Sequence, residues 1–71
     1  MLVDERRHLI AEAVIAQGAA TVADLSERFD VSQVTIRSDL EALETAGTLT
    51  RNRGGAVANR TSRFTPAFQQ Q

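Results

Sequence analysis

Residues 21–47 read TVADLSERFDVSQVTIRSDLEALETAG and decide the fold. Their apolar residues recur at helical spacing in two blocks, which predicts a short second helix and a third helix over residues 33–46. Between the blocks, Asp30 tolerates the left-handed backbone of a tight turn, and Ser32 is a good N-cap. The small Ser26 stands where the two helices must cross closely. Two short helices joined by a three-residue turn are the signature of a helix-turn-helix.

The chain before this stretch predicts one further helix. Apolar residues recur at helical spacing over residues 4–17, with Asp4 placed to cap the helix and Gly18 to end it. The second helix should begin at Thr21, because its spacing from Asp24 resembles a capping box. The three predicted helices are therefore short and closely connected.

After the third helix the pattern changes to a two-residue period. Residues 48–58 predict a β-hairpin, called the wing below, whose turn is marked by two adjacent glycines. Side chains alternate between the two faces of a strand, so the length of the hairpin loop decides whether Leu49 and Val57 face the same side. If both face the core, the loop must have three residues, 53–55, with Arg53 at its tip. The expected fold is mostly α with a small β-hairpin, a winged helix-turn-helix of three helices plus a wing in residues 1–59. Residues 60–71 are expected to be a linker.

The composition narrows the classes of function. A chain of 71 residues forms one small domain, and the absence of cysteine excludes disulfides and thiolate metal sites. One histidine cannot build a metal site, and no catalytic constellation or phosphate-cradling loop is present, so neither an enzyme nor a cofactor is expected. No apolar run reaches the length of a membrane span, and the first residues lack the order of a signal peptide. We expect a cytoplasmic protein with no membrane partner.

The charge is unevenly distributed along the chain. The net charge of −1 argues against a nucleic-acid partner. However, residues 1–44 hold four arginines and nine acids (−5), whereas residues 45–71 hold four arginines and no acid (+4). A local basic surface is therefore compatible with the acidic total. All eight basic residues are arginine, which suits phosphate and guanine contacts but is equally explained by genome composition.

The third helix has an outward face that suits the major groove of DNA. At about 100° per residue, Ile36, Leu40 and Leu43 share the core side, and the opposite side begins with short side chains. Asp39 lies between the two sides and is expected to fix the helix or a nearby arginine. Recognition helices insert their N-terminal turns into the groove. The residues expected to contact DNA are Ser32, Gln33, Val34, Thr35, Arg37 and Ser38 of the helix, with Arg51 and Arg53 of the wing.

Each of these residues also has a simpler interpretation. Arg37 has Glu41 four residues on as an ion-pair partner, and Ser32 is explained as a plain N-cap. Val34 is either a contact for a thymine methyl or an incidental surface residue. Gln33 lies nearer the core side by helical phase. The wing arginines would belong to a solvated hairpin.

The arginines of the first helix are also ambiguous. Arg6 and Arg7 would either contact the DNA backbone or form surface ion pairs with Asp4 or Glu5. The alternative for the whole chain is a winged-helix protein-interaction module that does not bind DNA. Such a module predicts an exposed apolar patch on the third helix, where only Val34 is apolar.

The order of residues over positions 4–57 resembles the DeoR family of bacterial transcriptional repressors. The matching residues are Val31-Ser32-Gln33-Val34-Thr35-Ile36-Arg37-Ser38-Asp39-Leu40, then Leu43-Glu44, Gly47, Leu49, Arg51 and Gly54-Gly55-Ala56. The family pattern is V-S-x-x-T-I-R-R-D-L, then L-E-x-x-G, then L-x-R-x-H-G-G-A. Ser38 stands where a second arginine is usual, so the resemblance carries no base contact over to it. Arg53 stands where the wing histidine is usual and restores a cation there.

The resemblance implies a DNA-binding domain of a larger regulator. Family members continue into a C-terminal domain that resembles sugar-phosphate isomerases and senses phosphorylated sugars or nucleosides. The expected partner of this chain is a double-stranded DNA operator. An effector would act only through that further domain, and the full-length protein is expected to be a homo-oligomer.

Overall fold

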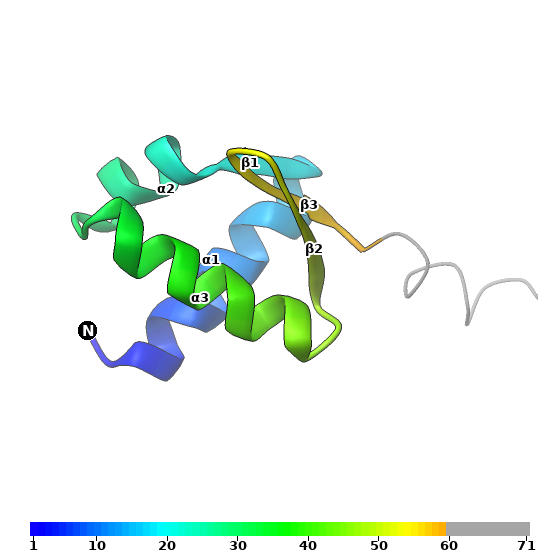
Figure 1. Ribbon diagram of the computed structural model, residues 1–71. Helices are drawn as coiled ribbons and strands as arrows, with labels where there is room; N and C mark the ends of the chain where they lie inside the picture. Colours follow the sequence, from blue (N-terminus) through cyan, green and yellow to red (C-terminus); the bar gives the residue numbers. More distant parts are fainter. Residues whose placement is uncertain (60–71) are drawn as a thin grey trace, which may run out of the picture.

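The computed structural model describes residues 1–59, in which three helices and a small sheet enclose one core (Figure 1). The elements in chain order are α1 (Val3–Gln17), β1 (Ala19–Thr21), α2 (Val22–Phe29), α3 (Gln33–Thr45), β2 (Leu49–Asn52) and β3 (Gly55–Ala58). Figure 1 shows α1 behind α3, with the sheet beside the helices. The arrangement confirms the predicted winged helix-turn-helix. The predicted linker, residues 60–71, lies outside the described residues.

Two of the predicted helix starts are confirmed by their caps. The Thr21 hydroxyl accepts a hydrogen bond from the Asp24 N–H at 3.0 Å, and the Ser32 hydroxyl accepts one from the Thr35 N–H at 3.1 Å. Each bond satisfies a backbone donor that the first helical turn leaves without a partner. Gly18 ends α1 with φ 84°, a conformation that favours glycine.

The predicted cap of the first helix is wrong. Leu2 is the N-cap, and its carbonyl accepts from the Arg6 N–H at 2.9 Å. The helix therefore begins one residue earlier, and Asp4 lies in its first turn without a capping bond. An acidic residue there still favours the helix, because the N-terminal end of a helix carries partial positive charge.

The sheet is larger than predicted, because residues 19–21 form a strand that the sequence pattern did not indicate. The strand order is β1-β3-β2 and both pairs are antiparallel. Ala-Ala-Thr has no strong strand propensity, so β1 forms by pairing with β3. A Cβ at Gly55 would overlap the Ala20 carbonyl oxygen, so this pairing needs glycine there.

The predicted three-residue loop of the wing is also wrong. Asn52 pairs with Gly55, which leaves a two-residue turn of Arg53 and Gly54, with Gly54 at φ 84°. Leu49 pairs with Ala58, so Val57 lies on the opposite face and is only half-buried. The expectation failed because it assumed that the largest apolar residue of the return strand faces the core. Two alanines, Ala56 and Ala58, take that role.

The core lies between the helices and the inner face of the sheet. Its largest fully buried apolar side chains are Ile10, Val14, Leu25, Ile36, Leu40 and Leu49. They come from all three helices and from β2, so one cluster joins the helix-turn-helix to the wing. This cluster fixes the outward face of α3, where the predicted contacts lie.

Candidate nucleic-acid interface

The turn between α2 and α3 has the geometry that the sequence predicts. Asp30 adopts φ 57° and ψ 47°, the left-handed conformation that aspartate tolerates better than most residues. The Ser26 hydroxyl donates to the Val31 carbonyl at 2.5 Å, and the Val31 N–H donates to the Ser26 carbonyl at 3.2 Å. The short Ser26 side chain thus links α2 directly to the turn. The turn therefore fixes the angle at which α3 leaves α2.

The N-terminal end of α3 presents hydroxyl groups. Besides capping the helix, the Ser32 hydroxyl donates to the Thr35 hydroxyl at 3.0 Å. Thr35 thus accepts through its oxygen and keeps its own hydrogen to donate outward. The cap is confirmed for Ser32, and the first turn also offers the free N–H groups of a helix start to an anion.

The predicted outward face of α3 is confirmed. Gln33, Val34, Arg37 and Ser38 are exposed, and 71% of the Val34 surface is accessible. Gln33 is more exposed than its helical phase suggested. The predicted α3 residues thus share one surface near the start of the helix.

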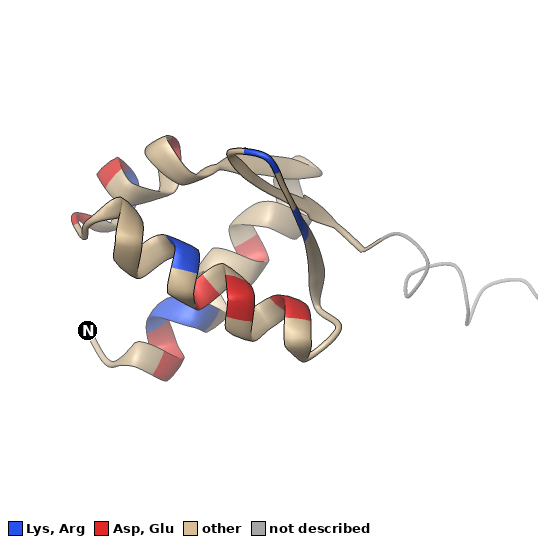
Figure 2. Ribbon diagram, viewed as in Figure 1, with Lys and Arg blue, Asp and Glu red and all other residues tan. Residues whose placement is uncertain are grey.

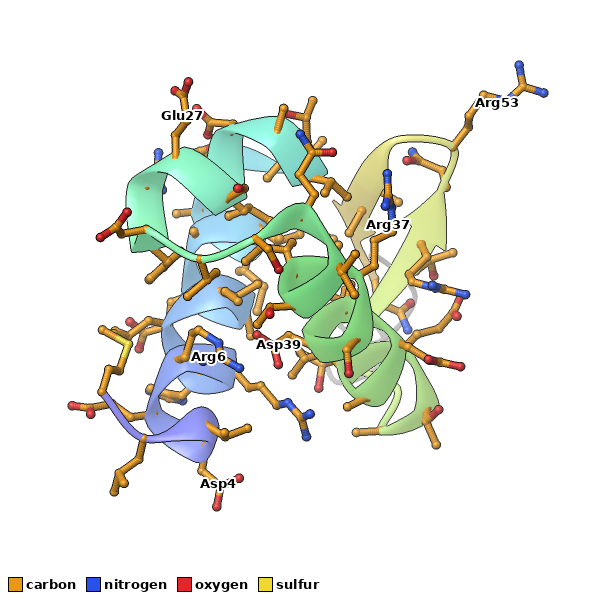
Figure 3. All side chains as sticks on the ribbon, turned by 60° about the vertical axis from the view of Figure 1, so that its left-hand side comes forward. Asp4, Arg6, Glu27, Arg37, Asp39 and Arg53 are labelled. Carbon is orange, nitrogen blue, oxygen red and sulfur yellow. The ribbon has the colours of Figure 1, made fainter. Side chains whose placement is uncertain are left out.

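Arg37 does not form the ion pair with Glu41 that was the alternative interpretation. Within residues 1–59 its guanidinium has no salt bridge or hydrogen bond to another residue. The side chain instead lines a groove between α3 and the wing, which also includes Leu40, Arg51 and Asn52. Figure 3 shows Arg37 directed into the space between α3 and the hairpin. Its cation is therefore available to a ligand.

The two wing arginines occupy different environments. Arg53 is exposed at the two-residue turn, and Figure 3 shows it extending away from the body of the domain. Arg51 instead places its Nε 3.2 Å from a carboxylate oxygen of Glu44. Figure 2 shows positive segments on α3 and on the wing at the same side of the molecule, and negative segments along the second half of α3. The surface is therefore basic at the wing and at the early part of α3.

Arg6 and Arg7 pair with Asp39 and not with Asp4 or Glu5, the partners that the sequence suggested. Arg6 Nε lies 2.5 Å from one carboxylate oxygen of Asp39, and Arg7 Nε lies 2.9 Å from the other. The Asp39 side chain is 1% exposed. The prediction that Asp39 fixes a nearby arginine is thus confirmed. Both arginines follow the first turn of α1 and cross to α3, which the sequence spacing does not reveal.

The ion pair shifts the titration of its members. Burial raises the pKa of Asp39, but the hydrogen bonds from Arg6 and Arg7 outweigh burial and lower that pKa below its ordinary value. The hydrogen bond to Asp39 raises the pKa of Arg6. Asp39 is therefore charged at neutral pH and joins α1 to α3 on the side of α3 away from the groove.

Residues 1–59 contain no group of three or more His, Cys, Asp or Glu side chains that could hold a metal ion. Every helix there is too short or too polar to cross a bilayer.

Comparison with known proteins agrees with this geometry. The chain is 44% identical over 64 residues to the L-fucose operon activator of Haemophilus influenzae, which covers 90% of this chain and 26% of that protein. It is 48% identical over 53 residues to the putative galactitol utilization operon repressor of Escherichia coli K12, covering 75% of this chain and 47% of that protein. It is 41% identical over 56 residues to the lactose phosphotransferase system repressor of Streptococcus mutans, covering 79% of this chain and 22% of that protein.

The chain spans less than half the length of each of these relatives. No solved structure matches it. The family model described as the DeoR-like helix-turn-helix domain matches residues 6–62, which include the whole helix-turn-helix and the wing. The chain therefore belongs to the DeoR-like helix-turn-helix family and is the DNA-binding domain of a transcriptional regulator, not an enzyme.

Proposed function

We propose that this domain binds a double-stranded DNA operator sequence-specifically, as part of a repressor of sugar or nucleoside metabolism genes. The observation that carries the proposal is the exposed outward face of the N-terminal half of α3. It bears Arg37, which has no ion-pair partner within residues 1–59, and the wing presents a second exposed cation, Arg53. In the proposed complex, residues 33–46 enter the major groove and the wing, residues 48–58, contacts the backbone or the minor groove.

The proposed contacts follow the chemistry of each side chain. Arg37 pairs with a guanine edge, Val34 contacts a thymine methyl, and Gln33 reaches an adenine edge. Phosphate oxygens are bound by the hydroxyls and N–H groups at the start of α3 and by the wing. The complete set is Ser32, Gln33, Val34, Thr35, Arg37, Ser38, Arg51 and Arg53.

The regulatory part of the proposal uses the names of the relatives. They include repressors of galactitol and lactose systems and an activator of an L-fucose operon. We therefore propose that the DNA site of this domain controls a sugar-related operon. We assign effector binding and homo-oligomer assembly to sequence beyond this domain, with residues 60–71 as the connection. Because such a regulator acts on chromosomal DNA, it would work in the cytoplasm.

The test compares Arg37 with Arg53. An operator is first selected from a random duplex library with the chain itself. Arg37→Ala should weaken operator binding by about 1–3 kcal/mol and relax the preference at one base step, because a base contact is lost. Arg53→Ala should weaken operator and scrambled duplex alike and reduce the salt slope by about one unit, because a phosphate contact is lost.

Three outcomes would contradict parts of the proposal. If Arg37→Ala weakens binding to both duplexes equally while Arg53→Ala weakens binding only to the operator, the wing and not α3 recognises the base sequence. If selection yields no preferred sequence, specific recognition by this domain is rejected. If no salt-dependent binding to any duplex is found, the protein-interaction alternative replaces the proposal.

A further inference from the structure

Glu44 holds β2 of the wing by two hydrogen bonds to the same residue, Arg51. One carboxylate oxygen accepts from the backbone N–H of Arg51 at 3.2 Å, and the other accepts from Arg51 Nε at 3.2 Å. The side chains of Glu44 and Arg51 are 39% and 40% exposed. The acid therefore reaches across from α3 to a wing residue that the DNA-binding proposal counts as a phosphate contact.

The position of Arg51 in the sheet explains this contact. β2 is an edge strand, so some of its N–H groups face away from β3 and need another partner. Arg51 also follows Leu49 by two residues, so its side chain shares the sheet face that Leu49 presents to α3. Both the N–H and the guanidinium of Arg51 are thus directed toward the last turns of α3, where Glu44 lies.

The backbone hydrogen bond makes this more than a surface ion pair. An exposed ion pair alone is weak, because water and salt compete for both charges. Here the N–H bond keeps the carboxylate against β2 even when the Arg51 side chain moves away. A phosphate that binds Arg51 would have to displace or approach this fixed negative charge.

We infer that Glu44 acts as an internal competitor for phosphate at Arg51, so that the phosphate attraction of the wing depends mainly on Arg53. The inference rests on the proposed DNA binding and refines which wing cation contributes to it. A carboxylate and a phosphate bind a guanidinium through the same donors, so occupancy by one reduces attraction for the other. Arg53 has no such competitor among residues 1–59. The effect of Glu44 is to lower affinity for duplex DNA of any sequence.

The experiment measures binding of the chain to a short duplex of random sequence across a salt series. Glu44→Gln removes the charge but keeps an oxygen that can accept from the Arg51 N–H. It should bind about fivefold more tightly at about 0.1 M salt, with a salt slope steeper by about one unit, because one more phosphate contact forms. Glu41→Gln is the matched control, since it removes the same charge from an exposed position of α3.

The double variant separates competition from simple repulsion. In an Arg51→Gln background, the advantage of Glu44→Gln over Glu41→Gln should disappear, because there is no cation left to release. An advantage that disappears supports the inference. Equal effects of the two glutamate substitutions, or an advantage that survives without Arg51, would overturn it.

A second comparison does not depend on Glu44 variants folding. In the wild-type background, Arg53→Gln should reduce the salt slope by about one unit, and Arg51→Gln by clearly less. Equal losses from the two substitutions contradict the inference while leaving the proposed function intact. Absence of salt-dependent binding by the wild type would instead reject the proposed function, and the inference with it. Thermal melting of each variant verifies that it is folded.

Discussion

The helical body and the wing are held by different kinds of contact. The body, α1 to α3, is fixed by large buried side chains such as Ile10, Leu25 and Ile36 and by the ion pair of Asp39. The wing gives the core one large side chain, Leu49, and otherwise small residues, with backbone pairing to β1. The orientation of α3 is thus fixed by side-chain packing, whereas the wing is attached mainly through backbone hydrogen bonds. Substitutions in the body should therefore cost more stability than substitutions in the wing.

The largest effect is expected for Ile36→Ala. The side chain is fully buried where α2 and α3 meet, so its loss should reduce the free energy of unfolding by about 2–5 kcal/mol. For a small domain this is a large fraction of the total stability. Val34→Ala, on the exposed face of the same helix, is the control and should change stability little. Thermal melting measures the difference. Similar melting temperatures for the two variants would show that Ile36 contributes no more to stability than an exposed residue.

Asp39→Asn should have the second largest effect. It leaves the Arg6 and Arg7 guanidinium groups without their anion and should reduce the free energy of unfolding by about 2 kcal/mol at neutral pH. Asp24→Asn is a matched control, because Asp24 is exposed and lies 3.8 Å from Arg28. Chemical unfolding of both variants gives the comparison.

The same variant predicts a pH dependence. Because the folded-state pKa of Asp39 is lowered, its contribution is complete above the ordinary aspartate pKa of about 4 and is lost as the pH falls through the folded-state pKa. The difference in unfolding free energy between wild type and Asp39→Asn should therefore shrink below about pH 4. A difference that stays constant from pH 7 to the acid range would show that charge is not involved.

Gly55→Ala probes the attachment of the wing. The added Cβ would overlap the Ala20 carbonyl oxygen, so β1 and β3 must shift apart. We expect a loss of about 1.5 kcal/mol, with the backbone amides of β1 exchanging hydrogen faster than those of α3. Uniform acceleration of exchange would mean that the wing and the body open as one unit.

The smallest effect is expected for Val57→Ala. Val57 is half-buried on the outer face of the sheet, so its truncation should cost less than about 1 kcal/mol. Leu49→Ala, on the inner face of the neighbouring strand, should cost several times more. If denaturant unfolding gives equal losses of stability for the two variants, Val57 faces the core as Leu49 does, and the three-residue loop is the correct one.

The helix-turn-helix could be predicted because its signals are local. The turn conformation of Asp30, the cap at Ser32 and the outward face of α3 depend on residues within a few positions of each other. Gly18 ends α1 for the same reason. Local preference and packing agree over this part of the chain, so the sequence pattern is sufficient.

What could not be predicted depends on contacts between distant residues. β1 forms through its pairing with β3, and Asp39 meets Arg6 and Arg7 across two helices. Arg51 is the instructive case, because its parity with Leu49 already places it on the inner face of the strand. Applying that parity to Arg51 as well as to the apolar residues would have placed it on the face toward α3, whereas Arg53 differs because it lies in the turn.

The strand at the middle of the sheet, β3, is also the last strand within residues 1–59. During synthesis, the three helices leave the ribosome before β3 does, and the contacts between α2 and α3 form over a short separation. β1 must wait for a partner that is made almost a whole domain later, so its edge stays unpaired on the nascent chain. The order of synthesis therefore means that β1 cannot pair before β3 has been made, whereas α2 and α3 can already contact each other.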